Sequence, residues 1–151
     1  MHIYETGTAA DVSLVATTAK TVLAWITPAT RRCRILEVQL GFNSQTSTDQ
    51  AVLIEVVRWT TDGTGSAVTP VALDPGNPAA LGSAKHSYTI EPTVPTILVP
   101  GQRITPQQGG TLIWQMPMTR ELYCAISNVI GIRLTAPNNQ SGVRCSMTVE
   151  E

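Results

Sequence analysis

The chain has 151 residues, a formal net charge of −1 and a charged fraction of 14%. This length favours a single domain, spanning 1–151, that buries its own core without disulfides or metals. A charged fraction well below the usual ~25% argues against intrinsic disorder and suggests that another chain covers part of the surface.

The N-terminal residues, MHIYETGTAADV, lack the positive region and the apolar stretch of a signal peptide. No apolar run is long enough to span a membrane. We therefore expect residues 1–10 to form an N-terminal arm, with His2 in a mobile terminus. The basic cluster of Arg31, Arg32 and Arg34 is expected to be the solvated start of a strand, so nucleic-acid binding is not predicted.

Short runs with a period of two, separated by turn residues, predict β-strands along the rest of the chain. These runs are 11–17, 21–27, 32–42, 51–60, 86–91, 96–100, 111–116, 121–126, 130–136 and 142–150. No helix of three turns separates them. The predicted fold class is all-β, a single-domain β-sandwich or jelly roll of about eight to ten antiparallel strands.

Alternation within these runs predicts which side chains face the core. In 51–60, Val52, Ile54 and Val56 share one face, opposite Trp59. In 32–42 the core face is expected to carry Leu36, Val38, Leu40 and Phe42, and the other face Ile35, Glu37 and Gln39. The final run, 142–150, alternates most regularly. The polar segment 43–50 is expected to join its two flanking strands as a hairpin with a long loop.

A long segment, 60–86, contains three prolines and lacks a long apolar run. As a linker it would leave residues 1–60 to fold alone, which is marginal for four strands without a disulfide. We therefore expect an ordered loop within one domain. It should contain a turn at 74–77 and one helical turn at 78–81. The apolar side chains of Val71, Leu73 and Leu81 are expected to pack against the domain and hold the loop in place.

Groups for catalysis or metal binding do not form a recognisable motif. Cys33, Cys124 and Cys145 lack metal-ligand spacing, so packing in the core is favoured, with a Cys124–Cys145 disulfide and a metal site as alternatives. His86 is expected at the surface. Neither a nucleophile elbow nor a phosphate loop occurs, so we predict no cofactor and no enzyme, although paired carboxylates of a hydrolase are not recognisable from sequence.

Trp25, Trp59 and Trp114 each fall in a predicted strand. Packing in the core or at a subunit interface is the favoured interpretation. The alternative is a platform on which sugar rings stack, as in a lectin-like sandwich.

Two long stretches, 16–43 and 52–80, resemble a group of small structural proteins of tailed bacteriophages. The similar features are Thr18–Leu23, Pro28-Ala29, Arg58–Thr61 and Ala67–Pro75, and the segment 131–151 also fits. The resemblance covers most of the chain, and its motifs are structural.

The resemblance implies a virion component, most plausibly a capsid decoration (cement) protein on the capsid exterior, assembled in the host cytoplasm. It implies a homo-oligomer, with a trimer favoured, and the major capsid protein as partner. Alternatives are a glycan-binding tail or fibre module, a minor tail or adaptor protein, and a sandwich-fold hydrolase.

Two elements are candidates for the contact with the partner: the arm at 1–7, which is expected to add to a neighbour's sheet edge, and the loop at 60–85. The candidate interface residues are Met1, His2, Ile3, Tyr4, Val71, Leu73, Asp74 and Pro75.

Overall fold

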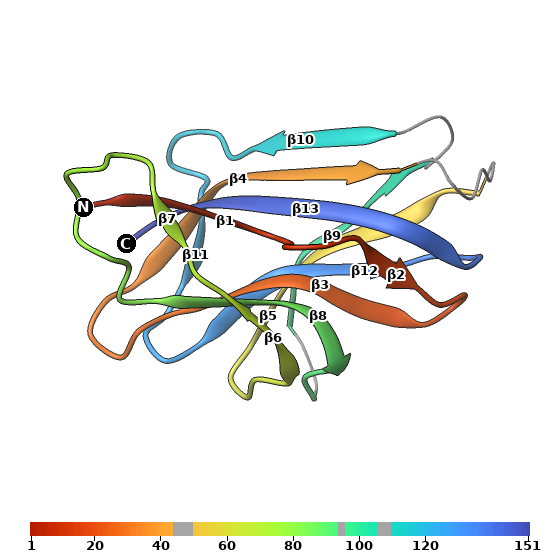
Figure 1. The fold of residues 1–151 in the computed structure, drawn as a ribbon, viewed down its shortest axis with the longest axis horizontal. Helices are drawn as coiled ribbons and strands as arrows, with labels where there is room; N and C mark the ends of the chain where they lie inside the picture. Colours follow the sequence, from red (N-terminus) through yellow and green to blue (C-terminus); the bar gives the residue numbers. More distant parts are fainter. Residues whose placement is uncertain (44–49, 94–95, 106–109) are drawn as a thin grey trace.

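The computed structural model describes residues 1–43, 50–93, 96–105 and 110–151. Its strands form two antiparallel sheets that enclose one main core, so the chain is a β-sandwich, as predicted (Figure 1). The described residues contain no α-helix. It follows that none of these residues belongs to a helix able to cross a membrane.

Thirteen strands occur among the described residues, more than the eight to ten predicted. They are β1 (Ile3–Gly7), β2 (Val12–Leu14), β3 (Ala19–Ile26), β4 (Cys33–Phe42), β5 (Val52–Trp59), β6 (Thr64–Val68), β7 (Val71–Ala72), β8 (Ser83–Ile90), β9 (Thr96–Ile104), β10 (Thr111–Gln115), β11 (Leu122–Cys124), β12 (Val129–Thr135) and β13 (Gln140–Glu150). The three unpredicted strands are β1, β6 and β7. They lie in the segments predicted as an arm and a loop.

Sheet A has the order β10-β4-β13-β1-β7, with β11 also paired to β4 and β2 to β13. Sheet B has the order β6-β8-β3-β12-β5-β9. Because β4 belongs to sheet A and β5 to sheet B, the predicted hairpin between them is wrong. The chain crosses from one sheet to the other there, through a segment that lies mostly outside the described residues.

The main core fills the space between the inner faces of the two sheets. The predicted alternation of β5 and β13 is confirmed, since Val52, Ile54 and Val56 are buried there together with the apolar residues of β13. In β4 the prediction fails at Ile35, which is buried rather than outward-facing, and at Leu36, which is half-buried and lies outside the core cluster. The register with β13 shifts between Thr148 and Val149, and this irregularity moves Ile35 to the inner side.

A second, smaller cluster covers the outer face of sheet B. Trp59 packs there, edge to face with Tyr88, with ring centroids 6.3 Å apart. Its ring also lies against Gly131. The Tyr88 hydroxyl donates to Asp62 Oδ1 at 2.7 Å, and Lys85 donates to the other Asp62 oxygen. Trp59 is therefore part of a packed layer, although it faces away from the main core.

The expected loop at 60–86 is ordered, but its details differ from the prediction. Asn77 N donates to Asp74 O at 3.0 Å, which confirms the turn at 74–77. The predicted helical turn at 78–81 is absent, because the amides of Leu81 and Gly82 donate to the Glu151 carboxylate at 2.6 and 3.0 Å. The side chains of Val71, Leu73 and Leu81 were expected to hold the loop against the domain, but they are exposed.

The predicted surface position of His86 is wrong: its side chain is buried, on the same side of β8 as Ala84. The alternation of β8 breaks at the next residue, Ser87, which has a left-handed φ of 52°. Tyr88 consequently joins the outer cluster while His86 stays inside. The His86 Nδ1 lies 2.8 Å from Ser87 Oγ.

Burial disfavours the imidazolium ion and lowers the pKa of His86 from 6.5. The unfolded chain therefore takes up a proton near pH 6.5, whereas the folded chain does so only at lower pH. The stabilising contribution of the neutral ring is complete above pH 6.5 and is lost as the pH falls towards the lowered value. We expect His86→Gln to flatten the decline of the urea midpoint between about pH 7.5 and 5.5. The same slope in variant and wild type would contradict this assignment.

Candidate functional site

The two termini lie at the same end of sheet A, as Figure 1 shows. The strand register places one row of side chains across the outer face of the sheet at this end. Its members, in order across the strands, are Tyr123, Arg34, Glu150, Ile3 and Leu73. The first four are successive register partners on β11, β4, β13 and β1, and Leu73 N donates to Ile3 O at 3.0 Å. Direct partners point to the same face of a sheet. We call these five residues the terminal row.

Arg34 is the electrostatic centre of the terminal row. Its Nε and Nη2 both lie 2.6 Å from Glu150 Oε2, and its Nη1 lies 3.2 Å from Glu121 Oε1. Hydrogen bonding to Glu150, and then to Tyr123, raises the pKa of the guanidinium. The Glu121 Oε2 atom is buried without a hydrogen-bond partner among the described residues. The row thus holds one fixed cation with carboxylates on two sides.

Apolar side chains flank this charged centre. Leu73 is 54% exposed and Tyr123 is 52% exposed, and Ile3 is exposed between the ion pair and Leu73. The Tyr123 ring also lies under the guanidinium, with 6.0 Å between Arg34 Cζ and the ring centroid. Met1, 84% exposed, has its sulfur 3.9 Å from Arg34 Nη2. Exposed apolar groups around a fixed charge are typical of a protein-binding surface.

A hollow of about 170 Å³ opens beside the terminal row. It is lined by Met1, Arg32, Cys33, Arg34, Tyr123, Glu150 and Glu151. The hollow is small for an organic cofactor or a drug-sized ligand, which occupies roughly 300–1,000 Å³. Its shape suits a single protruding side chain or a small molecule.

The predicted interface residues divide into two groups. Met1, Ile3, Val71, Leu73, Asp74 and Pro75 are exposed, and β1 and β7 bring the apolar ones among them to one face. Tyr4 is buried, since its partner Ala72 also faces the core, and its hydroxyl donates to Pro78 O at 3.1 Å. Burial raises the pKa of Tyr4, and so does Glu151. Tyr4 therefore anchors the loop and does not belong to the surface.

The prediction of a free N-terminal arm is wrong. Residues Ile3–Gly7 form β1, which pairs with β13 on one side and with β7 on the other. The half-buried His2 is also held, because it exchanges backbone hydrogen bonds of 2.9 and 3.0 Å with Glu151. The arm was expected to complete a neighbour's sheet, but it instead completes sheet A of its own chain.

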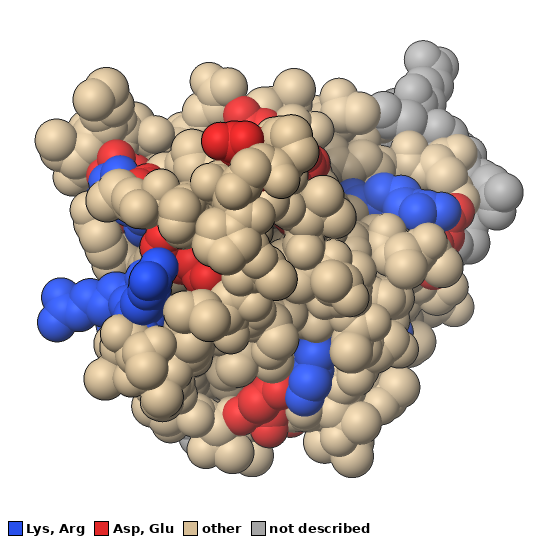
Figure 2. All heavy atoms as spheres, turned by 60° about the vertical axis from the view of Figure 1, so that its left-hand side comes forward, with Lys and Arg blue, Asp and Glu red and all other residues tan. Residues whose placement is uncertain are grey.

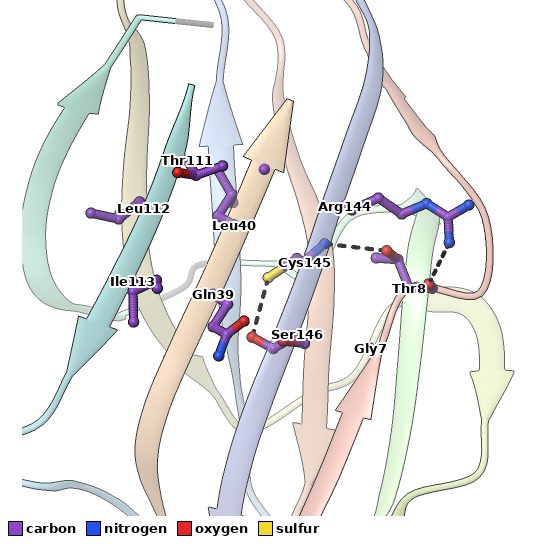
Figure 3. Close-up of a pocket in the computed structure, with 11 residues that line it drawn as sticks. Gly7, Thr8, Gln39, Leu40, Thr111, Leu112, Ile113, Arg144, Cys145 and Ser146 are labelled. Carbon is purple, nitrogen blue, oxygen red and sulfur yellow. Dashed lines mark hydrogen bonds between the residues drawn. The ribbon is translucent and has the colours of Figure 1, made fainter. Parts of the chain in front are cut away.

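A larger groove of about 420 Å³ runs along the outer face of sheet A, away from the terminal row (Figure 3). Its lining includes Gly7, Gly41, Ser146 and Ile113. Thr8 accepts from Cys145 N through its hydroxyl and from Arg144 through its carbonyl, as Figure 3 shows. Among the described residues, those that line this groove include no Asp or Glu.

The tryptophans do not form an exposed platform. Trp25 and Trp59 are buried, and Trp114 is half-buried and packed against the core. The core packing predicted for the tryptophans is therefore confirmed for Trp25, whereas Trp59 packs in the smaller cluster on the outer face of sheet B. No cluster of three potential metal ligands occurs within the part of the chain that the structure describes.

All three cysteines are buried and free, as the packing interpretation predicted. The alternative Cys124–Cys145 disulfide is contradicted. On β4, Cys33 is the register partner of Cys124, and Leu40 that of Cys145. Seven residues of strand separate those positions, or roughly 23 Å. Disulfides require Cα atoms within about 7 Å of each other.

Sequence reasoning missed Tyr123, Arg34, Glu121 and Glu150 as members of the site. Arg34 was assigned to a solvated strand start, which describes Arg31 and Arg32 but not Arg34. No local pattern signals the row, because its five members come from five distant parts of the sequence. No protein-family model matches this sequence, and no relative was found among curated proteins.

Proposed function

We propose that this chain is a structural protein of a tailed-phage virion, a capsid decoration protein that binds the outer surface of the major capsid protein and stabilises the shell. The terminal row carries the proposal. Exposed Ile3, Leu73 and Tyr123 surround a hydrogen-bonded arginine. Aromatic and arginine side chains dominate the energetics of protein interfaces, and apolar neighbours exclude water from them.

The fold is suited to a protein that holds its partner in a fixed geometry. The row lies on paired strands, so little conformational entropy is lost when a partner binds. Figure 2 shows a mostly uncharged face, with charged atoms in small, separate groups, in keeping with the charged fraction of 14%. In the proposed homotrimer the row would occur three times, and multivalency would convert weak single contacts into tight attachment.

A minor tail or adaptor protein would use the same surface with a different symmetry. The glycan-binding alternative, which rested on a platform of tryptophans, is less favoured because Trp25 and Trp59 are buried. The hydrolase alternative is also less favoured, because the larger groove has no carboxylate in its lining.

Light scattering of the purified chain, followed by co-sedimentation with empty shells of the encoding phage, tests the proposal. We expect a stable trimer that sediments with the shells. A monomer that stays in the supernatant would contradict decoration. A glycan array would then test the tail-module alternative.

A further inference from the structure

Two thiols of sheet A face each other across neighbouring strands. Cys33 begins β4, Cys124 ends β11, and the two residues are direct partners in the register of these strands. Direct partners in an antiparallel pair have Cα atoms about 4.5–5.5 Å apart. A disulfide spans Cα distances of about 4.4–6.8 Å. The backbone therefore already provides the spacing that a cross-strand disulfide needs.

Polar groups around the pair favour a thiolate on one of the two sulfurs. Thr27 Oγ1 lies 3.1 Å from Cys33 Sγ. The hydrogen bond between the two thiols lowers the pKa of Cys124. Burial opposes this change, whereas Thr27 and the charge of Arg58 add to it. The same contact raises the pKa of Cys33. The pair can therefore share one proton, which moves between the two sulfurs along their hydrogen bond.

The hollow beside the terminal row gives a small molecule access to Cys33, whereas Cys124 lies behind it and does not line the hollow. Cys33 is part of the lining of this 170 Å³ space. A liquid water molecule takes about 30 Å³, so a hydroperoxide of about twice that size fits in the hollow. Cys145 differs, because it lies opposite Leu40 and burial raises the pKa of its thiol to about 12.

We propose that Cys33 and Cys124 form a redox-sensitive pair, which a hydroperoxide such as hydrogen peroxide closes into a cross-strand disulfide. Cys33, which borders the hollow, passes its proton to Cys124 and attacks one peroxide oxygen; the O–O bond breaks, and a sulfenic acid forms on Cys33 as hydroxide leaves and takes up a proton to become water. The Cys124 sulfur then attacks the Cys33 sulfur, the S–O bond breaks, and the departing hydroxide takes the Cys124 proton and leaves as a second water. The two thiols lose two electrons, which the peroxide gains.

The Cys33–Cys124 disulfide would join the short strand β11 covalently to β4. Strand β11 has three residues, and β4 is its sheet partner in the described part of the chain. The residue between Leu122 and Cys124 is Tyr123 of the terminal row, so the bridge would also fix one end of that row. A crosslink that closes a loop this long is expected to raise the Tm by roughly 5–10 °C.

The test uses the purified full chain in native buffer, with and without hydrogen peroxide. We expect the free thiols, titrated after denaturation, to fall from three to one, and a non-reduced digest to contain a peptide that links Cys33 to Cys124. Dithiothreitol should restore all three thiols and the original Tm. Cys145→Ser is the matched control, and its two remaining thiols should both be lost.

Three free thiols after peroxide, or a linked peptide that contains Cys145, would overturn the proposal, as would disulfide-linked dimers. Because the linked peptide is identified in a digest of the wild-type chain, the test gives a result even if a cysteine variant does not fold. The readout is thiol chemistry of the free chain, so its outcome is independent of capsid binding and of the proposed function.

Discussion

Leu73→Asp and Tyr123→Ala are each expected to weaken binding to empty phage shells by about 30-fold, and together by 100-fold or more. Truncation of an interface hot spot costs about 2 kcal/mol or more, and each 1.4 kcal/mol is a factor of ten in affinity. Both side chains are about half exposed and belong to the terminal row. The aspartate would also place a charge at the apolar end of the row, beside Ile3. Quantitative co-sedimentation over a range of shell concentrations measures the change.

Ile90→Asp is the matched control, because Ile90 is 63% exposed on β8 of sheet B. It introduces the same charge at a similarly exposed apolar position on the other sheet. Shell binding should remain at the wild-type level, and circular dichroism should show that all three variants fold. Equal losses for Leu73→Asp and Ile90→Asp would mean that the terminal row is not the docking surface.

Gly131→Ala is expected to lower the free energy of unfolding by about 3 kcal/mol, near the upper end for overpacking. A Cβ atom at this position would lie 2.6 Å from Leu23 O, 2.8 Å from Ala24 Cβ and 2.9 Å from the Trp59 ring. The first of these is a backbone atom in the middle of sheet B, which moves only with the whole strand. Urea unfolding followed by circular dichroism measures the loss.

Gly41→Ala provides the comparison, since it makes the same change in a strand of the other sheet. A Cβ atom there meets only Thr111 Cγ2, at 3.8 Å, which is an ordinary contact. We expect a stability change of less than about 1 kcal/mol, because the added methyl group causes no overlap. A similar loss at both positions would indicate that the conformational freedom of glycine, rather than close packing, determines the effect.

The fold class could be predicted from the sequence because period-two alternation is strong wherever a strand has one buried face. The runs that became β4, β5 and β13 have this pattern. Strand β6, with the sequence TGSAV, has small, mostly exposed residues and no apolar alternation, so its sequence predicts a loop. Strand β7 has two residues, too few to show any period. Both become strands through pairing with β8 and β1, which only tertiary structure reveals.

The site was only partly predictable for a related reason. Ile3 and Leu73 were predicted as interface residues because one lies in the expected N-terminal arm and the other in the expected long loop. The sequence did not indicate that the two residues lie side by side. Tyr4 was wrongly included, since a single residue of register decides which neighbour in an edge segment faces inward. Arg34, Glu121 and Glu150 were missed because ion pairs between residues 87 and 116 positions apart leave no local pattern.

The pairing of Ile3 with Glu150 also constrains when the molecule can fold. In sheet A, β13 lies between β4 and β1, so the early strands lack their central partner until residues 140–150 have been synthesised. A ribosome-bound nascent chain would present these strands with open edges. Pairings this distant in sequence close slowly, and open edges promote aggregation. Sheet A is therefore completed only after β13 has been synthesised, and until then its open edges are expected to be met by the cell's chaperones.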